Sequence, residues 1–311
     1  MIRRSLRIPH RALSAATATG ALVAGLLLQT GSASAAPSVE DFWTAERMRA
    51  AEPLDVLPVS PGDLNKVKEG VEKLVPPTGL PGTEAFPETG GPWTGGGKVT
   101  STAGRVFFTY QGRQASCSGN AVTSANKSTV LTAGHCVKMD GAWHTNWVFV
   151  PEYKDGQAPH GKWTAAKTLS TPQWTATEDI NYDVGAAVVN PLDGKKLTDV
   201  VGAQGVAFNT GYNKKLYAFG YPAADPYDGS KLIHCSGDSI QDPLLSSDHG
   251  LSCDMTGGSS GGPWFQDFDE ASGTGLQNSV NSFGYTFLPG FMFGPYFGDD
   301  AKNLYEKAQA S

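Results

Sequence analysis

Residues 257–263 read Gly-Gly-Ser-Ser-Gly-Gly-Pro, and this run is the most informative stretch of the chain. Glycine has no side chain, so backbone N–H groups beside a serine can point at one spot without obstruction. An oxyanion hole for acyl transfer needs two such donors, and the amides of Gly258 and Ser260 would supply them. The run therefore predicts a nucleophilic serine, with Gly261 and Gly262 leaving room for a substrate.

Two earlier stretches contain the partners that a nucleophilic serine requires. Residues 131–136, Leu-Thr-Ala-Gly-His-Cys, place His135 after an apolar strand end, and residues 181–184, Asn-Tyr-Asp-Val, place Asp183 before a small apolar run. A serine hydroxyl becomes a good nucleophile when a histidine takes its proton and a carboxylate holds that histidine in the right tautomer. We therefore predict His135 as general base, Asp183 as its orienting carboxylate and Ser260 as nucleophile.

The order His, Asp, Ser and the local contexts of His135 and Ser260 resemble those of the chymotrypsin family of serine peptidases, over about residues 106–311. The resemblance implies an all-β fold of two six-stranded antiparallel barrels with a short C-terminal helix and the active site between the barrels. It also implies a serine endopeptidase that forms an acyl-enzyme. The Gly-Gly-Pro after the nucleophile selects Ser260 over Ser259.

Other interpretations of the same residues are weaker. Asp179 is the alternative to Asp183, but it lies in a more polar stretch. Residues 258–262 also fit the Gly-x-Ser-x-Gly elbow of α/β-hydrolases, whose histidine follows the serine in the chain. None of the six histidines follows Ser260, so that fold would lack its base. A non-catalytic binding protein on a protease scaffold is the second functional hypothesis, and the complete set of catalytic residue types disfavours it.

The first 97 residues differ in character from the rest. Residues 1–35 combine a basic start, an apolar stretch over 21–28 and small residues that end at Ala35, as in a secretory signal peptide. The apolar stretch is well short of the roughly 20 residues that span a bilayer. We therefore expect a secreted, extracellular protein without membrane attachment once the signal is removed.

We call residues 36–97 the leader and predict that they form a propeptide and linker, which are cut away when the zymogen is processed. The peptidase domain is expected over residues 98–311. Short helices are expected over 40–51 and 64–74, followed by a stretch rich in proline and glycine. The leader has few apolar residues to bury, so we expect it to be mobile or loosely docked. Cleavage between residues 91 and 101 would leave the first strand of the domain intact.

Short β-rich runs separated by glycine turns predict the all-β domain itself, and 38 glycines in 311 residues agree with many turns. A closing helix is predicted over 299–310, with Asp299 or Asp300 at its N-cap. The expected strands cover residues 104–110, 116–123, 128–133, 147–153, 182–189, 205–207, 216–220, 263–265 and 279–285.

Charge and cysteine content limit the possible partners. A formal net charge of −6 without a basic run after the signal gives no support for a nucleic-acid partner. Four cysteines in an exported protein predict two disulfides, and of the three possible pairings we expect the local ones, Cys117–Cys136 and Cys235–Cys253. No Cys-x-x-Cys spacing is present, so we expect no metal and no cofactor. We expect a monomer that acts on protein or peptide substrates.

The residues that select the substrate are predicted from the resemblance. Asp254 lies six residues before Ser260, the spacing at which trypsin-like members bind lysine or arginine, whereas Ser259 and the low cysteine count resemble the bacterial branch that contains glutamyl endopeptidases. That branch uses a histidine on the strand after the nucleophile, where this chain has none, so Asn281 or Ser282 would meet a polar side chain. The segment Ser282, Phe283 and Gly284 resembles the one that pairs with the substrate backbone as an added strand.

Overall fold

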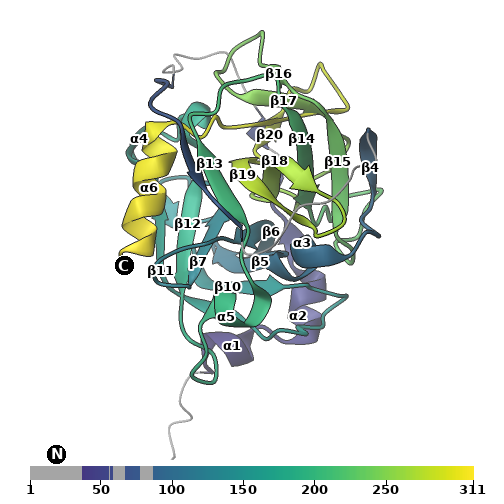
Figure 1. Cartoon of the computed structure of the whole chain (residues 1–311). Coiled ribbons are helices and arrows are strands. Elements are labelled where there is room, and N and C mark those ends of the chain that lie inside the picture. The colour runs from purple at the N-terminus through teal and green to yellow at the C-terminus, as the bar shows by residue number, and fades with distance from the viewer. Residues whose placement is uncertain (1–36, 56, 59–66, 78–86) are drawn as a thin grey trace, which may run out of the picture. The chain divides into compact units, whose positions relative to one another are not determined.

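The computed structural model of the protein describes residues 37–55, 57–58, 67–77 and 87–311 (Figure 1). Residues 103–189 form a closed six-stranded barrel, which we call the first half of the molecule, and residues 205–294 form what we call the second half. The antiparallel strands of the first half run in the order β6-β5-β10-β11-β12-β7, and β7 pairs again with β6 to close the barrel. The strands are β5 (Ala103–Tyr110), β6 (Arg113–Ala121), β7 (Thr129–Thr132), β10 (Thr145–Pro151), β11 (Trp163–Ser170) and β12 (Gly185–Val189).

Alternating apolar side chains explain why these strands close around a core. Val106, Phe108, Val130 and Phe149 are fully buried inside the barrel, together with the Cys117–Cys136 disulfide. A two-residue turn with positive φ at both positions connects β5 to β6, the geometry that suits the twist of a tight hairpin. The barrel expected for the first half is confirmed.

The second half contains two sheets. The larger one has the order β3-β13-β19-β18-β14-β15-β4, and the smaller one has the order β16-β17-β21-β20-β2. The second half is all-β, as expected, and among the described residues its strands form two sheets that are not joined explicitly into a closed barrel. The strands contributed by this half are β13 (Gly205–Phe208), β14 (Lys215–Gly220), β15 (Ile233–Asp238), β16 (Ile240–Gln241), β17 (His249–Ser252), β18 (Pro263–Asp269), β19 (Thr274–Val280), β20 (Phe283–Gly284) and β21 (Phe291–Gly294).

Several strands of the two halves were not predicted from the sequence, whereas the helix at the end of the chain was predicted. Polar sequences such as the WTAAKTLS of β11 and the HGLS of β17 hide their strand character, because tertiary burial rather than local pattern places them in a sheet. β15 and β21 were missed as well. The predicted closing helix is α6 (Asp299–Gln309), which buries Leu304, Tyr305 and Ala308 against the barrel, with Gly298 rather than an aspartate at its N-cap.

Short elements connect the strands. They are α3 (Gly97–Thr102), α4 (Pro172–Thr177), the 3-10 turn η1 (Ile180–Tyr182), α5 (Leu197–Val201) and the small hairpin of β8 (Lys138–Met139) and β9 (Ala142–Trp143). Both expected disulfides are formed, Cys117–Cys136 in the first half and Cys235–Cys253 in the second. The helix α4 and the turn η1 matter most for the candidate site, since they follow one another and η1 ends directly before Asp183.

The described parts of the leader are folded onto the domain, so the expectation of a loosely docked leader was wrong. Trp43 and Met48 are 0% and 2% exposed, and the Trp43 indole donates to the carbonyl of Asn146. The helix expected over 40–51 is interrupted at Trp43. The elements of the leader are α1 (Val39–Phe42), α2 (Ala45–Ala50), β1 (Glu52–Pro53), β2 (Leu57–Pro58), β3 (Lys73–Val75) and β4 (Glu88–Pro92).

Some predictions for the N-terminal region fall on undescribed residues. The signal peptide over 1–35 lies outside the described part, as does the start of the helix expected over 64–74, whose described remainder contains β3 and no helix. Within the described residues, no helix combines the length and the apolar character needed to cross a membrane.

Candidate active site

His135 and Asp183 lie together in the first half and are joined by two hydrogen bonds. The Asp183 carboxylate accepts from the backbone N–H of His135 at 2.7 Å and meets Nδ1 of the His135 ring at 2.7 Å. Both side chains are fully buried. Since an ionised carboxylate only accepts, Nδ1 carries the proton, and Nε2 is left as the ring's basic nitrogen.

Local structure explains how this pair forms. Asp183 caps the C-terminal end of η1, two residues before β12, and His135 follows β7, the neighbour of β12 in the barrel. Gly134 lies between the two: a Cβ there would approach Trp174 to 2.7 Å and the Asp183 carboxylate to 2.9 Å. Glycine at this position is therefore a steric requirement for the close approach of histidine and aspartate.

Ser282 also binds the aspartate. Its hydroxyl donates to Asp183 Oδ2 at 2.6 Å from the second half of the molecule. The sequence predicted Ser282 as a substrate-binding residue, whereas its side chain in this structure supports the orienting carboxylate. The two halves are thus connected directly at the candidate site.

Sequence analysis missed two further residues that hold His135. His144 binds the His135 carbonyl through Nε2 at 2.8 Å, so that nitrogen must carry a proton, and burial lowers the pKa of His144 to about 4. The ring of Trp174 packs beside the His135 ring, with 6.3 Å between centroids. Neither residue belongs to a recognisable motif, so only their position in the barrel reveals the role.

Ser260 lies on a turn that is locked by glycine. Gly258 and Gly261 adopt positive φ values of 92° and 80°, and a Cβ at Gly261 would lie 2.1 Å from Thr132 Oγ1. The Ser260 carbonyl accepts from the amide of Ser118 at 2.7 Å. The Ser259 hydroxyl points into the loop and donates to the Thr256 carbonyl at 2.7 Å. Ser259, the alternative candidate for the nucleophile, is therefore engaged in a hydrogen bond within the loop.

Carbonyl contacts decide where the two candidate oxyanion amides point. The Gly257 carbonyl accepts from the amide of Ala223 at 2.8 Å, and in a trans peptide the N–H of the next residue, Gly258, then points the opposite way. The Ser259 carbonyl is held in the same manner, by the Asn281 side-chain amide at 2.9 Å. The N–H of Ser260 is thereby directed away from Asn281.

Both the nitrogen and the oxygen of the Asn281 side-chain amide are hydrogen-bonded in these contacts. Its amide nitrogen donates to the carbonyls of Phe219 and Ser259, and its oxygen accepts from the Trp264 indole at 2.6 Å. The side chain is fully buried. The structure therefore gives Asn281 a role in positioning the nucleophile turn, and not the contact with a substrate side chain that the sequence suggested.

The groups that would exchange a proton are not hydrogen-bonded to each other in this structure. His135 Nε2 and Ser260 Oγ are both buried and have no hydrogen-bond partner. They nevertheless belong to adjoining segments, because Cys136, beside His135, contacts the Ser260 carbonyl through Sγ at 3.5 Å.

The predicted specificity residues are distributed unevenly. Phe283 is buried and Gly284 partly exposed on β20, directly after Ser282. Asp254 is exposed, and its carboxylate accepts from the Tyr227 hydroxyl at 2.6 Å. A preference for lysine or arginine would need a carboxylate at the base of a buried pocket, and Asp254 does not have that environment here.

The candidate site offers no set of metal ligands. Among the described residues, the one group with suitable spacing is Cys117, His135 and Cys136, whose ligand atoms lie within 4.8 Å of one another. The two cysteines form a disulfide with each other, so neither is a thiolate. Nδ1 of His135 is already bound to Asp183.

Solved structures of proteases are similar to this chain. No family model matches the chain. The crystal structure of the protease Anisep from Arthrobacter nicotinovorans is 47% identical, with a TM-score of 0.65, over 68% of this chain and 96% of that one. The thermostable serine protease AL20 from an extremophilic microorganism is 42% identical, with a TM-score of 0.65, over 69% and 99%.

More distant similarities add the fold and one short match. A Glu endopeptidase structure is 17% identical over 72% of this chain and 98% of its own, with a TM-score of 0.57, and supports the fold alone. An extracellular metalloprotease of Bacillus subtilis is 35% identical over 79 residues. This match covers 25% of the chain and about a quarter, 24%, of the length of that curated relative.

Proposed function

The chain belongs to the bacterial serine proteases of trypsin-like fold, and from this premise we propose that it is a secreted serine endopeptidase that acts through His135, Asp183 and Ser260. The observation that carries the proposal is the double hydrogen bond between Asp183 and His135, which leaves Nε2 as the basic nitrogen beside a glycine-locked serine. Two disulfides support an oxidising, extracellular location.

The proposed reaction has two stages. Ser260 Oγ attacks the carbonyl carbon of the scissile bond and gives its proton to His135 Nε2, while Asp183 remains ionised and stabilises the imidazolium. The amides of Gly258 and Ser260 bind the oxyanion. The C–N bond then breaks, and His135 returns the proton to the leaving amine. Water, deprotonated by His135, hydrolyses the resulting ester and restores the Ser260 hydroxyl.

A fluorophosphonate probe tests the nucleophile, with protein recovered from culture medium. The probe is expected to label Ser260, and Ser260→Ala is expected to abolish labelling and lower peptide hydrolysis by about a million-fold. Ser259→Ala is the matched control, because its hydroxyl binds a carbonyl within the loop, and this variant should still be labelled. Labelling that persists in Ser260→Ala would contradict the proposal.

Removal of the leader is a second part of the proposal. Thr94 and Gly95 are exposed between β4 and α3, so this connection is accessible to a protease. N-terminal sequencing of the secreted protein should find a start between residues 91 and 101. A fully active enzyme that begins at Ala36 would argue against a removable propeptide.

A further inference from the structure

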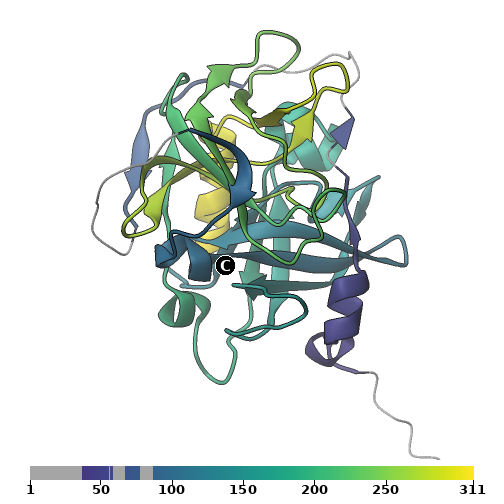
Figure 2. The same ribbon diagram turned by 90° about the vertical axis from the view of Figure 1, so that its right-hand side faces the viewer.

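The leader crosses the candidate active site from one half of the molecule to the other. β1 pairs in parallel with β6, where Pro53 is opposite Ser116, and Leu57 of β2 pairs in parallel with Phe283 of β20. Figure 2 shows the purple N-terminal chain leaving its two helices and running along one side of the molecule. Both partner strands adjoin the site, since Ser116 precedes Cys117 and Phe283 follows Ser282.

Between these pairings, the backbone of Leu54 is bound on both sides. Its N–H donates to the Ser116 carbonyl at 2.9 Å, and its carbonyl accepts from the Gly258 amide at 3.0 Å. The Gly258 amide is the donor that we assign to the oxyanion hole. A carbonyl of the protein's own leader thus binds one of the two amides that we assign to the oxyanion.

We propose that residues 52–55 together with Leu57, which we call the strap, hold the peptidase inactive by filling its cleft until the leader is removed. The inference rests on the proposed function. With the strap in place, His135 and Ser260 are 0% and 1% exposed, so neither side chain is open to a substrate. Leu54 itself is 8% exposed and packs with the apolar core of the first half.

The residues before the strap anchor it to the first half. Trp43 packs against Phe107 at 5.4 Å between ring centroids, and Lys162 Nζ donates to the Glu40 and Trp43 carbonyls. Met48 is buried in the same cluster. Because the strap belongs to the same chain, its effective concentration at the cleft is high, and this advantage is lost when the leader is cut from the domain and dissociates.

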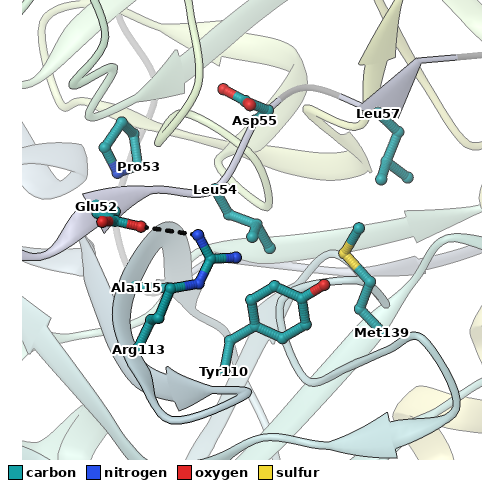
Figure 3. Close-up of a pocket in the computed structure, with 9 residues that line it drawn as sticks. All are labelled: Glu52, Pro53, Leu54, Asp55, Leu57, Tyr110, Arg113, Ala115 and Met139. Atoms are coloured by element: carbon teal, nitrogen blue, oxygen red, sulfur yellow. Dashed lines mark hydrogen bonds and ion pairs between the residues drawn. The ribbon is translucent and has the colours of Figure 1, made fainter.

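The geometry favours an inhibitor over a substrate. Among the described residues, the Leu54 carbonyl accepts from the amide of Gly258 and not from that of Ser260. Ser260 Oγ has no hydrogen bond to His135 Nε2 while the strap is bound. The serine is therefore not activated against this carbonyl. A cavity of about 290 Å³ remains beside the strap. Figure 3 shows Leu54 of the strap together with Tyr110 and Met139 around this cavity.

The test measures how fast the fluorophosphonate probe labels the full chain before processing, with intact mass as a check on the leader. Leu54→Ala and Trp43→Ala should each raise the labelling rate by about tenfold or more, because losing the docking of either side chain exceeds the about 1.4 kcal/mol that a tenfold change requires. Leu74→Ala is the matched control: Leu74 belongs to the leader but is 49% exposed on β3, and its variant should label like wild type.

Each outcome decides something. A peptide of residues 37–55, added to Leu54→Ala, should slow labelling again, and this result would support the strap even if Trp43→Ala fails to fold. Equal and fast labelling of all four proteins would overturn the strap and leave the proposed function standing. Cleavage of wild type after Leu54 would also overturn it, since the strap would then be a substrate. No labelling of any protein, processed or not, would overturn the proposed function and the strap with it.

Discussion

The two halves of the molecule hold their proposed catalytic groups by different means. In the first half, His135 and Asp183 are fixed to each other by bonds from side chains, inside a closed barrel. In the second half, Ser260 lies on a glycine turn whose amides are directed indirectly, by what binds the Gly257 and Ser259 carbonyls. One half therefore orients a side chain, and the other orients a backbone.

Because of this difference, the two halves should respond differently to substitutions. A side-chain pair depends on the chemistry of two residues, so one substitution removes its function while the barrel persists. A backbone arrangement depends on supports such as Asn281, whose loss shifts amides that no substitution can remove directly. The predictions that follow test this contrast, from the largest expected effect to the smallest.

Asp183→Asn should cause the largest loss, about 10⁴-fold in kcat, because an amide in place of the carboxylate favours the wrong His135 tautomer. Peptide hydrolysis by the processed protein, with thermal unfolding alongside, measures the effect. The barrel should remain folded, since the substitution keeps the shape of the side chain. Asp179→Asn is the control and should retain its activity. A comparable loss in both variants would mean that the aspartate acts through folding and not through His135.

Asn281→Ala should lower kcat by about 10²-fold, the lower end of what removing an oxyanion donor costs, because the Ser259 carbonyl keeps its hydrogen bond from the Gly262 amide but loses the one from Asn281. Asn278→Ala is a matched control: Asn278 is equally buried on β19 but binds Gln266. Both variants should be less stable to urea, and only Asn281→Ala should lose kcat while KM stays close to wild type. Equal kcat values in the two variants would refute the positioning role.

The halves also differ in what their buried histidines do. Burial lowers the pKa of both His144 and His249 to about 4, but His249 lies on β17 among Tyr212 and Tyr296. Above pH 6.5 the ring is neutral in the folded and unfolded states. As the pH falls from 6.5 towards 4, His249 becomes protonated in the unfolded chain but stays neutral in the folded chain, so the free energy of unfolding decreases.

His249→Phe should therefore reduce the loss of unfolding free energy between pH 7 and pH 4.5 by up to about 3 kcal/mol. The neighbouring Asp248 acts in the opposite direction, because burial raises the pKa of its carboxyl, and comparing each protein with itself at two pH values isolates the histidine. The pH dependence of peptide hydrolysis should not change. An unchanged stability difference would show that His249 is not neutral in the folded state.

The smallest effect is expected for the ion pair between the strap and the first half. Arg113 meets Glu52 at 3.2 Å, and both side chains are about 60% exposed, at 60% and 63%. Such pairs contribute about 1 kcal/mol or less, so Arg113→Ala should raise the labelling rate of the full chain less than about fivefold. The increase should shrink further at high salt. A rise as large as that of Leu54→Ala would mean that this exposed ion pair contributes as much to strap binding as the burial of Leu54.

Much of the candidate site was predictable because its chemistry is carried by side chains in short stretches. The contexts of His135, Asp183 and Ser260 each lie within a few residues, and the cysteines of each disulfide are less than twenty residues apart. Glycine turns and apolar alternation likewise predicted an all-β fold with a closing helix. These features depend on neighbours in the chain, so the sequence by itself determined them.

Tertiary structure alone decided how those groups are supported and covered. Ser282 binds Asp183 although the two residues are 99 positions apart in the sequence. The carbonyl of Leu54 accepts from the amide of Gly258, and nearly every residue type has these backbone groups. Contacts made by backbone carbonyls and amides cannot be recognised from residue types. The leader has few apolar residues, so its sequence did not predict that Trp43 would be buried against strands distant in the chain. What the sequence could not show is therefore the part of the site made by backbone contacts between segments far apart in the chain.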